Sequence, residues 1–105
     1  SARRVGSLRL RFPAGEGTLA LYTLDDAADP HLFVPFRDAA AGRETYGAGR
    51  YVEATLLAGG VVELDFNRAY NPDCAYGIAA SCPITPAENT LPFAVEAGEM
   101  MPREH

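Results

Sequence analysis

The stretch RYVEATLLAGGVVELDF, residues 50–66, decides the fold. Its two ends, residues 50–57 and 61–66, alternate between apolar and other side chains, and Ala58-Gly59-Gly60 supplies a turn between them. Successive side chains of a strand point to opposite faces, so the apolar set is expected to face the core: Val52, Ala54, Leu56, Val62, Leu64 and Phe66. The opposite face carries Glu53, Glu63 and Asp65. The stretch therefore predicts an antiparallel hairpin with one buried face.

Further strands are expected on both sides of this hairpin. Val5–Phe12 alternates between apolar and polar side chains, and Thr18–Leu24 is apolar on both faces. Leu32–Phe36 is a short apolar run whose Pro35 predicts an edge or a bulge, because proline donates no ladder hydrogen bond. Pro92–Ala97 is expected to be the last strand. The chain is therefore predicted to be mainly β, a small antiparallel barrel or sandwich of about six strands with one long ordered loop.

Length and charge narrow the function classes. A chain of 105 residues is expected to form a single β domain over residues 1–105. Its net charge of −5 opposes binding to nucleic acid, since phosphates require a basic surface. No apolar run reaches the roughly 20 residues of a membrane span. A cytoplasmic protein with no membrane partner is predicted, and export with a removed leader stays an alternative, because the chain starts at Ser1 without an initiator methionine.

The residue types that are missing exclude several chemistries. The chain has no lysine, so it offers neither the Schiff base of pyridoxal phosphate enzymes nor a Walker A phosphate loop. Its histidines are His31 and His105, which cannot make a three-histidine zinc site. None of its serines lies in a Gly-x-Ser-x-Gly motif. Neither a cofactor nor a metal is therefore predicted.

The segment Asp65–Asn89 carries most of the functional information. Residues 67–90 show no clear periodicity, and loops of this length in compact domains are usually functional or disordered. Two tyrosines, two cysteines and the prolines after Asn71 and Cys82 favour order, because a residue that precedes proline is biased toward extended conformations. An ordered loop held by side-chain hydrogen bonds is expected.

Several words in and around this segment form an ordered pattern. They are LDFNRAYNP at 64–72, Cys74-Ala75, Cys82-Pro83 and Glu88-Asn89, together with residues 36–38, 42–51 and 97–99. This pattern resembles an uncharacterised prokaryotic family, domain of unknown function 1684, over Val5–Glu99. The chain departs from the family pattern at three positions where the family tends to have proline: Asp73, Thr85 and Ala87. It also lacks the tryptophan-rich N-terminal region of longer members. The resemblance implies a fold and the location of a site, and no activity.

Six side chains are candidates for ligand binding: Arg37, Asp65, Arg68, Tyr70, Asn71 and Glu88. Arg68 can bind an anionic group in bidentate fashion, with Asp65 as an acceptor or base. The alternative, which is favoured for this pair, is an internal ion pair that fixes the loop. For Tyr70 and Asn71 the alternatives are a core aromatic and a turn residue before proline.

The two cysteines leave more than one interpretation open. Cys74 and Cys82 do not have the Cys-x-x-Cys spacing of thioredoxin-like enzymes. A disulfide between them would stabilise the fold by roughly 2.5 kcal/mol on the chain-entropy model. Two buried free thiols are equally compatible with the sequence. A zinc site would need two more ligands and is disfavoured.

Two function classes follow from these residues. The first is a non-catalytic domain that binds a small polar or anionic ligand or takes part in an interaction. The second is a small enzyme that uses Asp65, Arg68 and Tyr70 on such a molecule. A homodimer is also expected, because the absence of the N-terminal region leaves apolar surface to be covered.

Overall fold

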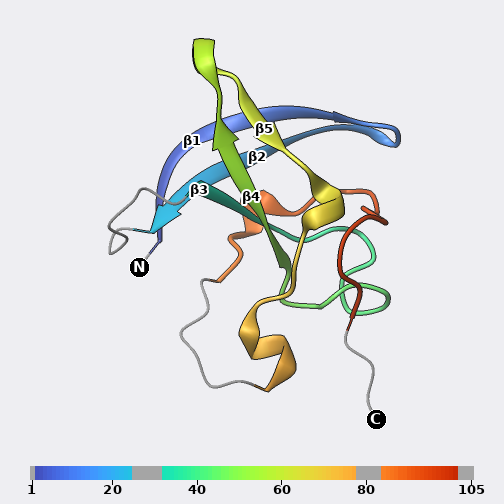
Figure 1. The fold of residues 1–105 in the computed structure, drawn as a ribbon. Coiled ribbons are helices and arrows are strands. Elements are labelled where there is room, and N and C mark those ends of the chain that lie inside the picture. The colour runs from blue at the N-terminus through green and yellow to red at the C-terminus, as the bar shows by residue number, and fades with distance from the viewer. Residues whose placement is uncertain (1, 25–31, 78–83, 102–105) are drawn as a thin grey trace.

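Five antiparallel strands form one sheet and follow one another in chain order. They are β1 (Ala2–Phe12), β2 (Gly15–Leu24), β3 (Leu32–Phe36), β4 (Arg50–Leu56) and β5 (Val62–Leu64). A 3₁₀ turn, η1 (Ala58–Gly60), connects β4 and β5, and three more follow β5: η2 (Phe66–Arg68), η3 (Asp73–Tyr76) and η4 (Ala87–Asn89). The computed structural model describes residues 2–24, 32–77 and 84–101. Figure 1 shows the sheet curled into half of a barrel, which confirms the predicted mainly β, barrel-like fold.

The predicted antiparallel hairpin is formed by β4 and β5. Ala54 pairs with Leu64, Thr55 with Glu63 and Leu56 with Val62, and the glycines of η1 make the turn with positive φ. Val52 is buried, and the pair Ala54 and Leu64 packs against the core. The expectation for Leu56 was wrong, because its side chain is 63% exposed. The tip of the hairpin extends beyond the core, so alternation there no longer implies burial.

The core includes residues from beyond β5. Its buried members are Leu19, Leu21, Val34, Phe36, Val52, Ala69, Leu91 and Val95. Phe66 packs edge-on against Phe12 and Phe36, with ring centroids 5.1 and 5.2 Å apart. Burying each large apolar side chain contributes about 1.5–3 kcal/mol. The segment after β5 is therefore part of the folded core.

The predicted last strand, Pro92–Ala97, is wrong, because no strand is formed among the described residues 84–101. Instead the loop after β3 holds this stretch. The Val95 N–H donates to Oδ2 of Asp38 at 2.7 Å, and the Ala39 N–H donates to the Phe93 carbonyl at 3.1 Å. The local pattern of residues 92–97 could not show that a carboxylate replaces a strand as the partner of Val95.

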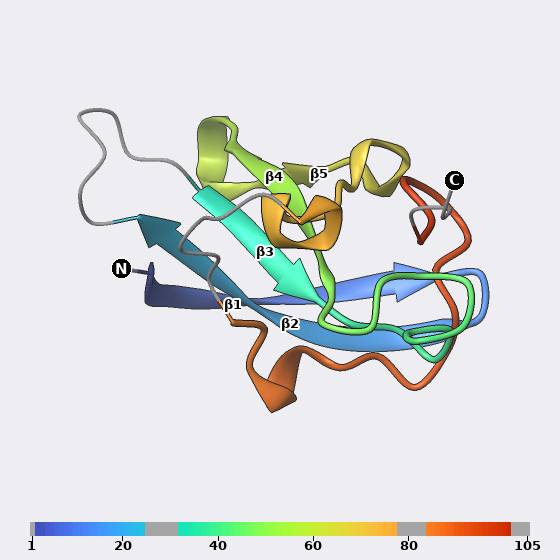
Figure 2. The ribbon, with the colours of Figure 1, turned by 90° about the horizontal axis from the view of Figure 1, so that it is seen from below.

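Asn89 lies where β2 and β3 separate. The ladder between these strands contains the pairs Tyr22–Phe33 and Thr23–Leu32, so the same register, continued by two pairs, would bring Ala20 opposite Pro35. Pro35 has no N–H to donate. The buried side chain of Asn89 accepts from the Ala20 N–H at 2.7 Å. It also donates to the carbonyls of Ala20 and Pro35 at 3.0 and 2.6 Å. One side chain thus supplies the hydrogen bonds that the ladder lacks, and η4 runs alongside β2 (Figure 2).

Arg50 ties the C-terminal stretch to the sheet. Its side chain is 1% exposed, and its guanidinium donates to the carbonyls of Val95, Ala97 and Glu99 at 2.9, 2.6 and 2.9 Å. It also lies 3.5 Å from the Asp38 carboxylate. Burial lowers the pKa of Arg50, and the charge of Asp38 opposes that effect. A planar guanidinium with several donors suits such a set of acceptors.

Replacing Gly98 by alanine is expected to cost far more stability than the same change at Gly59. Both glycines have positive φ, 83° and 80°, so both variants carry the backbone strain of about 1 kcal/mol or more. A Cβ at Gly98 would lie 2.7 Å from the Ala69 Cβ and 2.8 Å from the Phe66 carbonyl oxygen, whereas Gly59 has nothing within 4 Å. We expect Gly98→Ala to lose at least about 2 kcal/mol more in urea unfolding. Equal losses would show that the C-terminal stretch does not pack closely on η2.

Candidate functional site

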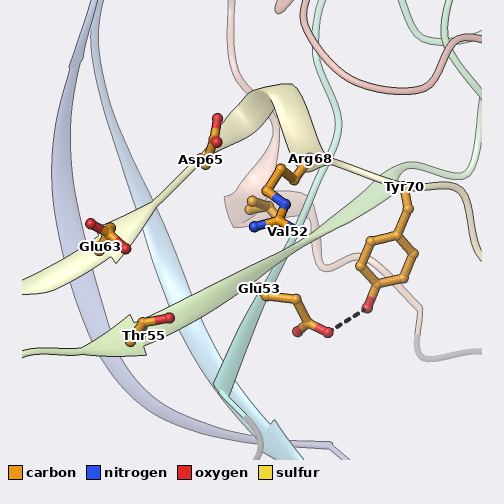
Figure 3. A pocket seen from close by; sticks show the side chains of 7 residues that line it. All are labelled: Val52, Glu53, Thr55, Glu63, Asp65, Arg68 and Tyr70. Atoms are coloured by element: carbon orange, nitrogen blue, oxygen red, sulfur yellow. Dashed lines mark hydrogen bonds between the residues drawn. The ribbon is translucent and has the colours of Figure 1, made fainter.

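A cleft of about 430 Å³ lies on the polar face of the hairpin. It is lined by Val52, Glu53, Thr55, Glu63, Asp65, Arg68 and Tyr70. The side chains of β4 and β5 that lie opposite the core reach this face because residues alternate along each strand. Arg68 comes from η2, and Tyr70 follows it. Figure 3 shows the Arg68 side chain reaching over Val52 between the two strands.

The structure brings together three of the six predicted site residues, Asp65, Arg68 and Tyr70. The favoured interpretation of Asp65 and Arg68 as an ion pair was wrong, since no hydrogen bond or ion pair joins their side chains. The Asp65 carboxylate instead accepts from the Asn67 N–H at 3.0 Å and caps η2. Within the described residues the Arg68 guanidinium makes no ion pair, which leaves it available over the cleft.

Tyr70 is fixed mainly through its backbone. Tyr51 and Tyr70 exchange two backbone hydrogen bonds of 2.9 Å, and their rings pack edge-on with centroids 5.7 Å apart. The Tyr70 hydroxyl donates a long bond of 3.4 Å to Oε1 of Glu53. Burial raises the pKa of Tyr51 to about 12, so its hydroxyl stays protonated in neutral solution. Because its backbone is held by the two hydrogen bonds to Tyr51, Tyr70 presents its hydroxyl from a fixed position at the rim of the cleft.

Charge in the cleft is unbalanced. Three carboxylates, those of Glu53, Glu63 and Asp65, share the lining with the single guanidinium of Arg68. Among the described residues, no three His, Cys, Asp or Glu side chains come close enough to hold a metal ion. The carboxylates are thus spread along the cleft rather than gathered at one point, and they can contact separate donors of one molecule.

Asn71 belongs to a second, structural network outside the cleft. Its N–H donates to Oε1 of Glu99 at 2.7 Å, and its side-chain amide donates to the Tyr76 hydroxyl and the Met100 carbonyl at 3.1 and 2.9 Å. The Tyr76 hydroxyl in turn donates to Oε2 of Glu99 at 2.9 Å. Asn71 is 4% exposed and therefore positions the loop rather than a ligand.

Arg37 and Glu88 also lie apart from the cleft. The backbone of Arg37 pairs with the η4 region, donating to the Asn89 carbonyl and accepting from the Leu91 N–H. Glu88 accepts from Arg4 Nε at 3.2 Å and from the Tyr22 hydroxyl at 3.3 Å. Burial, together with the charge and hydrogen bond of Glu88, raises the pKa of Tyr22. Both candidates thus connect η4 to the rest of the fold.

The proposed link between Cys74 and Cys82 cannot be placed, because Cys82 lies outside the described residues. The link therefore stays a prediction. The structure describes the long loop up to residue 77 and again from residue 84. In these two parts η2, η3 and η4 give the loop local order. Within the described part of the chain, no helix has the length and apolar character needed to cross a membrane.

Glu53, Thr55 and Glu63 were missed as site residues. Alternation had already placed Glu53 and Glu63 on the same face as Asp65, which is the signal that could have found them. Thr55 shares that face by the same rule. What the sequence could not show is that Arg68 turns back over this face after the 3₁₀ turn.

Comparisons with known proteins agree with the fold and give no activity. The chain resembles a solution NMR structure of an uncharacterized protein from Haloarcula marismortui with 41% identity and a TM-score of 0.72. The match covers 94% of this chain and 56% of that one, so the chain spans little more than half the length of that relative. No curated protein matches.

A family profile matches residues 1–100, nearly the whole chain. The profile is described as a protein of unknown function (DUF1684). Its extent agrees with the resemblance found from the words between Val5 and Glu99. The chain therefore belongs to the DUF1684 family.

Proposed function

We propose that the domain binds a small polar molecule in the cleft beside Arg68, without catalysing a reaction. The observation that supports this most is the position of Arg68, which lies over a cleft and makes no ion pair within the described residues. The volume of about 430 Å³ falls in the range of small-molecule sites. Arginine is well suited to bind a carboxylate or phosphate through two parallel hydrogen bonds.

The charges that line the cleft indicate a more specific class of ligand than simple anions. An anionic group beside Arg68 would also experience the repulsion of three carboxylates on the same cleft. A molecule that carries a cationic or donor group in addition satisfies both kinds of side chain. We therefore expect a zwitterion, whose anionic end contacts Arg68 and whose cationic end contacts Glu53 or Glu63.

A titration followed by amide NMR shifts tests this proposal. The probes are a panel of free amino acids, with acetate and ethylamine as the corresponding single-charge molecules. At low salt, where exposed charges are least screened, amino acids should shift the amides of Glu53, Arg68 and Tyr70. Each single-charge molecule should bind at least about tenfold more weakly, since one of the two charge interactions is lost. Equal binding of acetate would contradict recognition of two charges.

Arg68→Gln should weaken amino acid binding by about tenfold or more, because the bidentate charged contact is lost. The matched control is Arg43→Gln, which removes an exposed arginine that donates to the Ala39 carbonyl away from the cleft. The control should bind as the unaltered protein does. If both variants bind equally well, Arg68 has no part in the site.

No observation favours the second candidate, a small enzyme that uses Asp65, Arg68 and Tyr70. Burial of the Asp65 side chain would support this second candidate. The side chain of Asp65 is exposed, and its carboxylate already accepts the Asn67 N–H. The geometry thus gives Asp65 a capping role and leaves ligand binding as the better explanation of the cleft.

A further inference from the structure

The sheet does not close into a barrel, and an apolar groove lies between its two edge strands. Strand β1 pairs on one side with β2, and β5 pairs on one side with β4, so each has a free edge among the described residues (Figure 1). The groove has a volume of about 430 Å³. Its apolar lining includes Leu10, Phe12, Leu57, Val61, Leu64 and Phe66. It is separate from the ligand cleft, although Glu63 borders both.

Two apolar side chains at the groove are exposed to solvent. Leu57 and Val61 are 43% and 57% exposed. They line one groove together with other apolar side chains instead of standing alone on the surface. Contiguous exposed apolar surface of this kind marks an interaction site.

The charges on the two rims of the groove are complementary. Arg11 lies on the β1 rim and Glu63 on the β5 rim. Arg11 is 85% exposed at its side chain and contacts only the exposed Glu16, at 3.4 Å, among the described ion pairs. A two-fold axis along the groove would set the β1 rim of one copy against the β5 rim of another. Arg11 would then face Glu63 of the second copy, twice per dimer.

We propose that a second copy of this chain covers the groove, so that two half-barrels associate through their open sides. Apolar side chains of both copies then form the centre of the interface, and the Arg11 and Glu63 pairs form its rim. Such an arrangement follows the usual anatomy of protein interfaces, with an apolar centre and a polar rim. It also covers the free strand edges, which otherwise invite non-specific association.

Sedimentation equilibrium of the whole chain tests the proposal, with a dimer expected at micromolar concentration. Leu57→Glu should weaken association at least about 100-fold, because it places a charge in the apolar centre. The matched control is Leu56→Glu, the neighbouring leucine, which is 63% exposed and does not line the groove. Neither leucine lines the ligand cleft, so loss of dimerisation can be separated from loss of ligand binding.

Charge exchange provides a second measurement. Arg11→Glu and Glu63→Arg should each weaken association about tenfold, and the double variant should restore it, because the reversed charges attract again. A wild-type monomer at high micromolar concentration would overturn the proposal and leave the groove to additional polypeptide, of which the solved relative has more. Dissociation by Leu56→Glu but not by Leu57→Glu would place the interface elsewhere and would equally overturn it.

Discussion

Arg50→Met should destabilise the fold by about 3–5 kcal/mol, the cost of removing one partner of a buried ion pair. The variant loses three bonds to the carbonyls of Val95, Ala97 and Glu99. It also leaves the buried carboxylate of Asp38 with hydrogen bonds from Thr45 and Val95 but without its cation. Urea unfolding followed by circular dichroism measures the loss.

Two further variants keep this prediction testable if Arg50→Met does not fold. Arg50→Lys retains the charge, but one ammonium group cannot reach the same acceptors with planar geometry, so an intermediate loss is expected. In Arg50→Lys, amide hydrogen exchange should increase most, relative to the unaltered protein, at Val95 and Glu99, whose N–H groups donate to Asp38 and Ala69. Arg43→Met is the matched control, since exposed Arg43 makes one bond to a carbonyl and should lose less than about 0.5 kcal/mol. Similar losses at both arginines would refute the role of Arg50.

Asn89→Ala should lose a similar amount, about 3–5 kcal/mol. The substitution removes three buried hydrogen bonds and leaves the Ala20 N–H and the Pro35 carbonyl without them. A buried polar group without a partner costs about 1–3 kcal/mol, and the variant leaves more than one such group. The control Asn67→Ala changes an exposed asparagine of η2 and should be nearly neutral. A loss below about 1 kcal/mol at Asn89 would contradict the bridging role.

Asn89→Ala removes both the amide donors and side-chain volume. Asn89→Asp removes the amide donors alone, so comparing the two variants separates these effects. The aspartate keeps an acceptor for the Ala20 N–H but, once ionised, cannot donate to the two carbonyls. Burial would raise its pKa in the folded state, so the folded protein binds the proton more tightly than the unfolded chain. Its stability relative to the unaltered protein should therefore fall as pH rises from about 4 toward 7. Asn89→Ala should show no such dependence, which chemical unfolding at several pH values can measure.

The sequence predicted the parts of the fold in which local pattern determines the outcome. The alternation in β4 and β5 predicted their antiparallel pairing and the polar face that carries the cleft, because side-chain direction in a strand follows from position alone. Three of the candidates chosen from the family words, Asp65, Arg68 and Tyr70, line one cleft. Pattern was less informative at the hairpin tip, where Leu56 alternates correctly and is nevertheless exposed.

What the sequence could not predict depends on contacts between distant residues. Asn89 bonds Ala20 across 69 positions, and Arg50 bonds Glu99 across 49. An isolated asparagine or arginine gives no local sign of burial, since both residue types are usually exposed. The absent Asp65–Arg68 ion pair is the opposite case. Residues three apart in sequence suggested a contact, whereas the Asp65 carboxylate accepts from the Asn67 N–H and caps η2.

The Arg50 contacts have a consequence for the order of events during synthesis. Strand β4 emerges from the ribosome well before Val95, Ala97 and Glu99, which supply the acceptors for its guanidinium. Until then the half-barrel cannot enclose that charge without a large desolvation cost. The nascent chain should therefore remain open until nearly all of residues 1–99 have been made. Translation products that stop short of Val95 should be rapidly degraded, because they expose the apolar face that the C-terminal stretch covers.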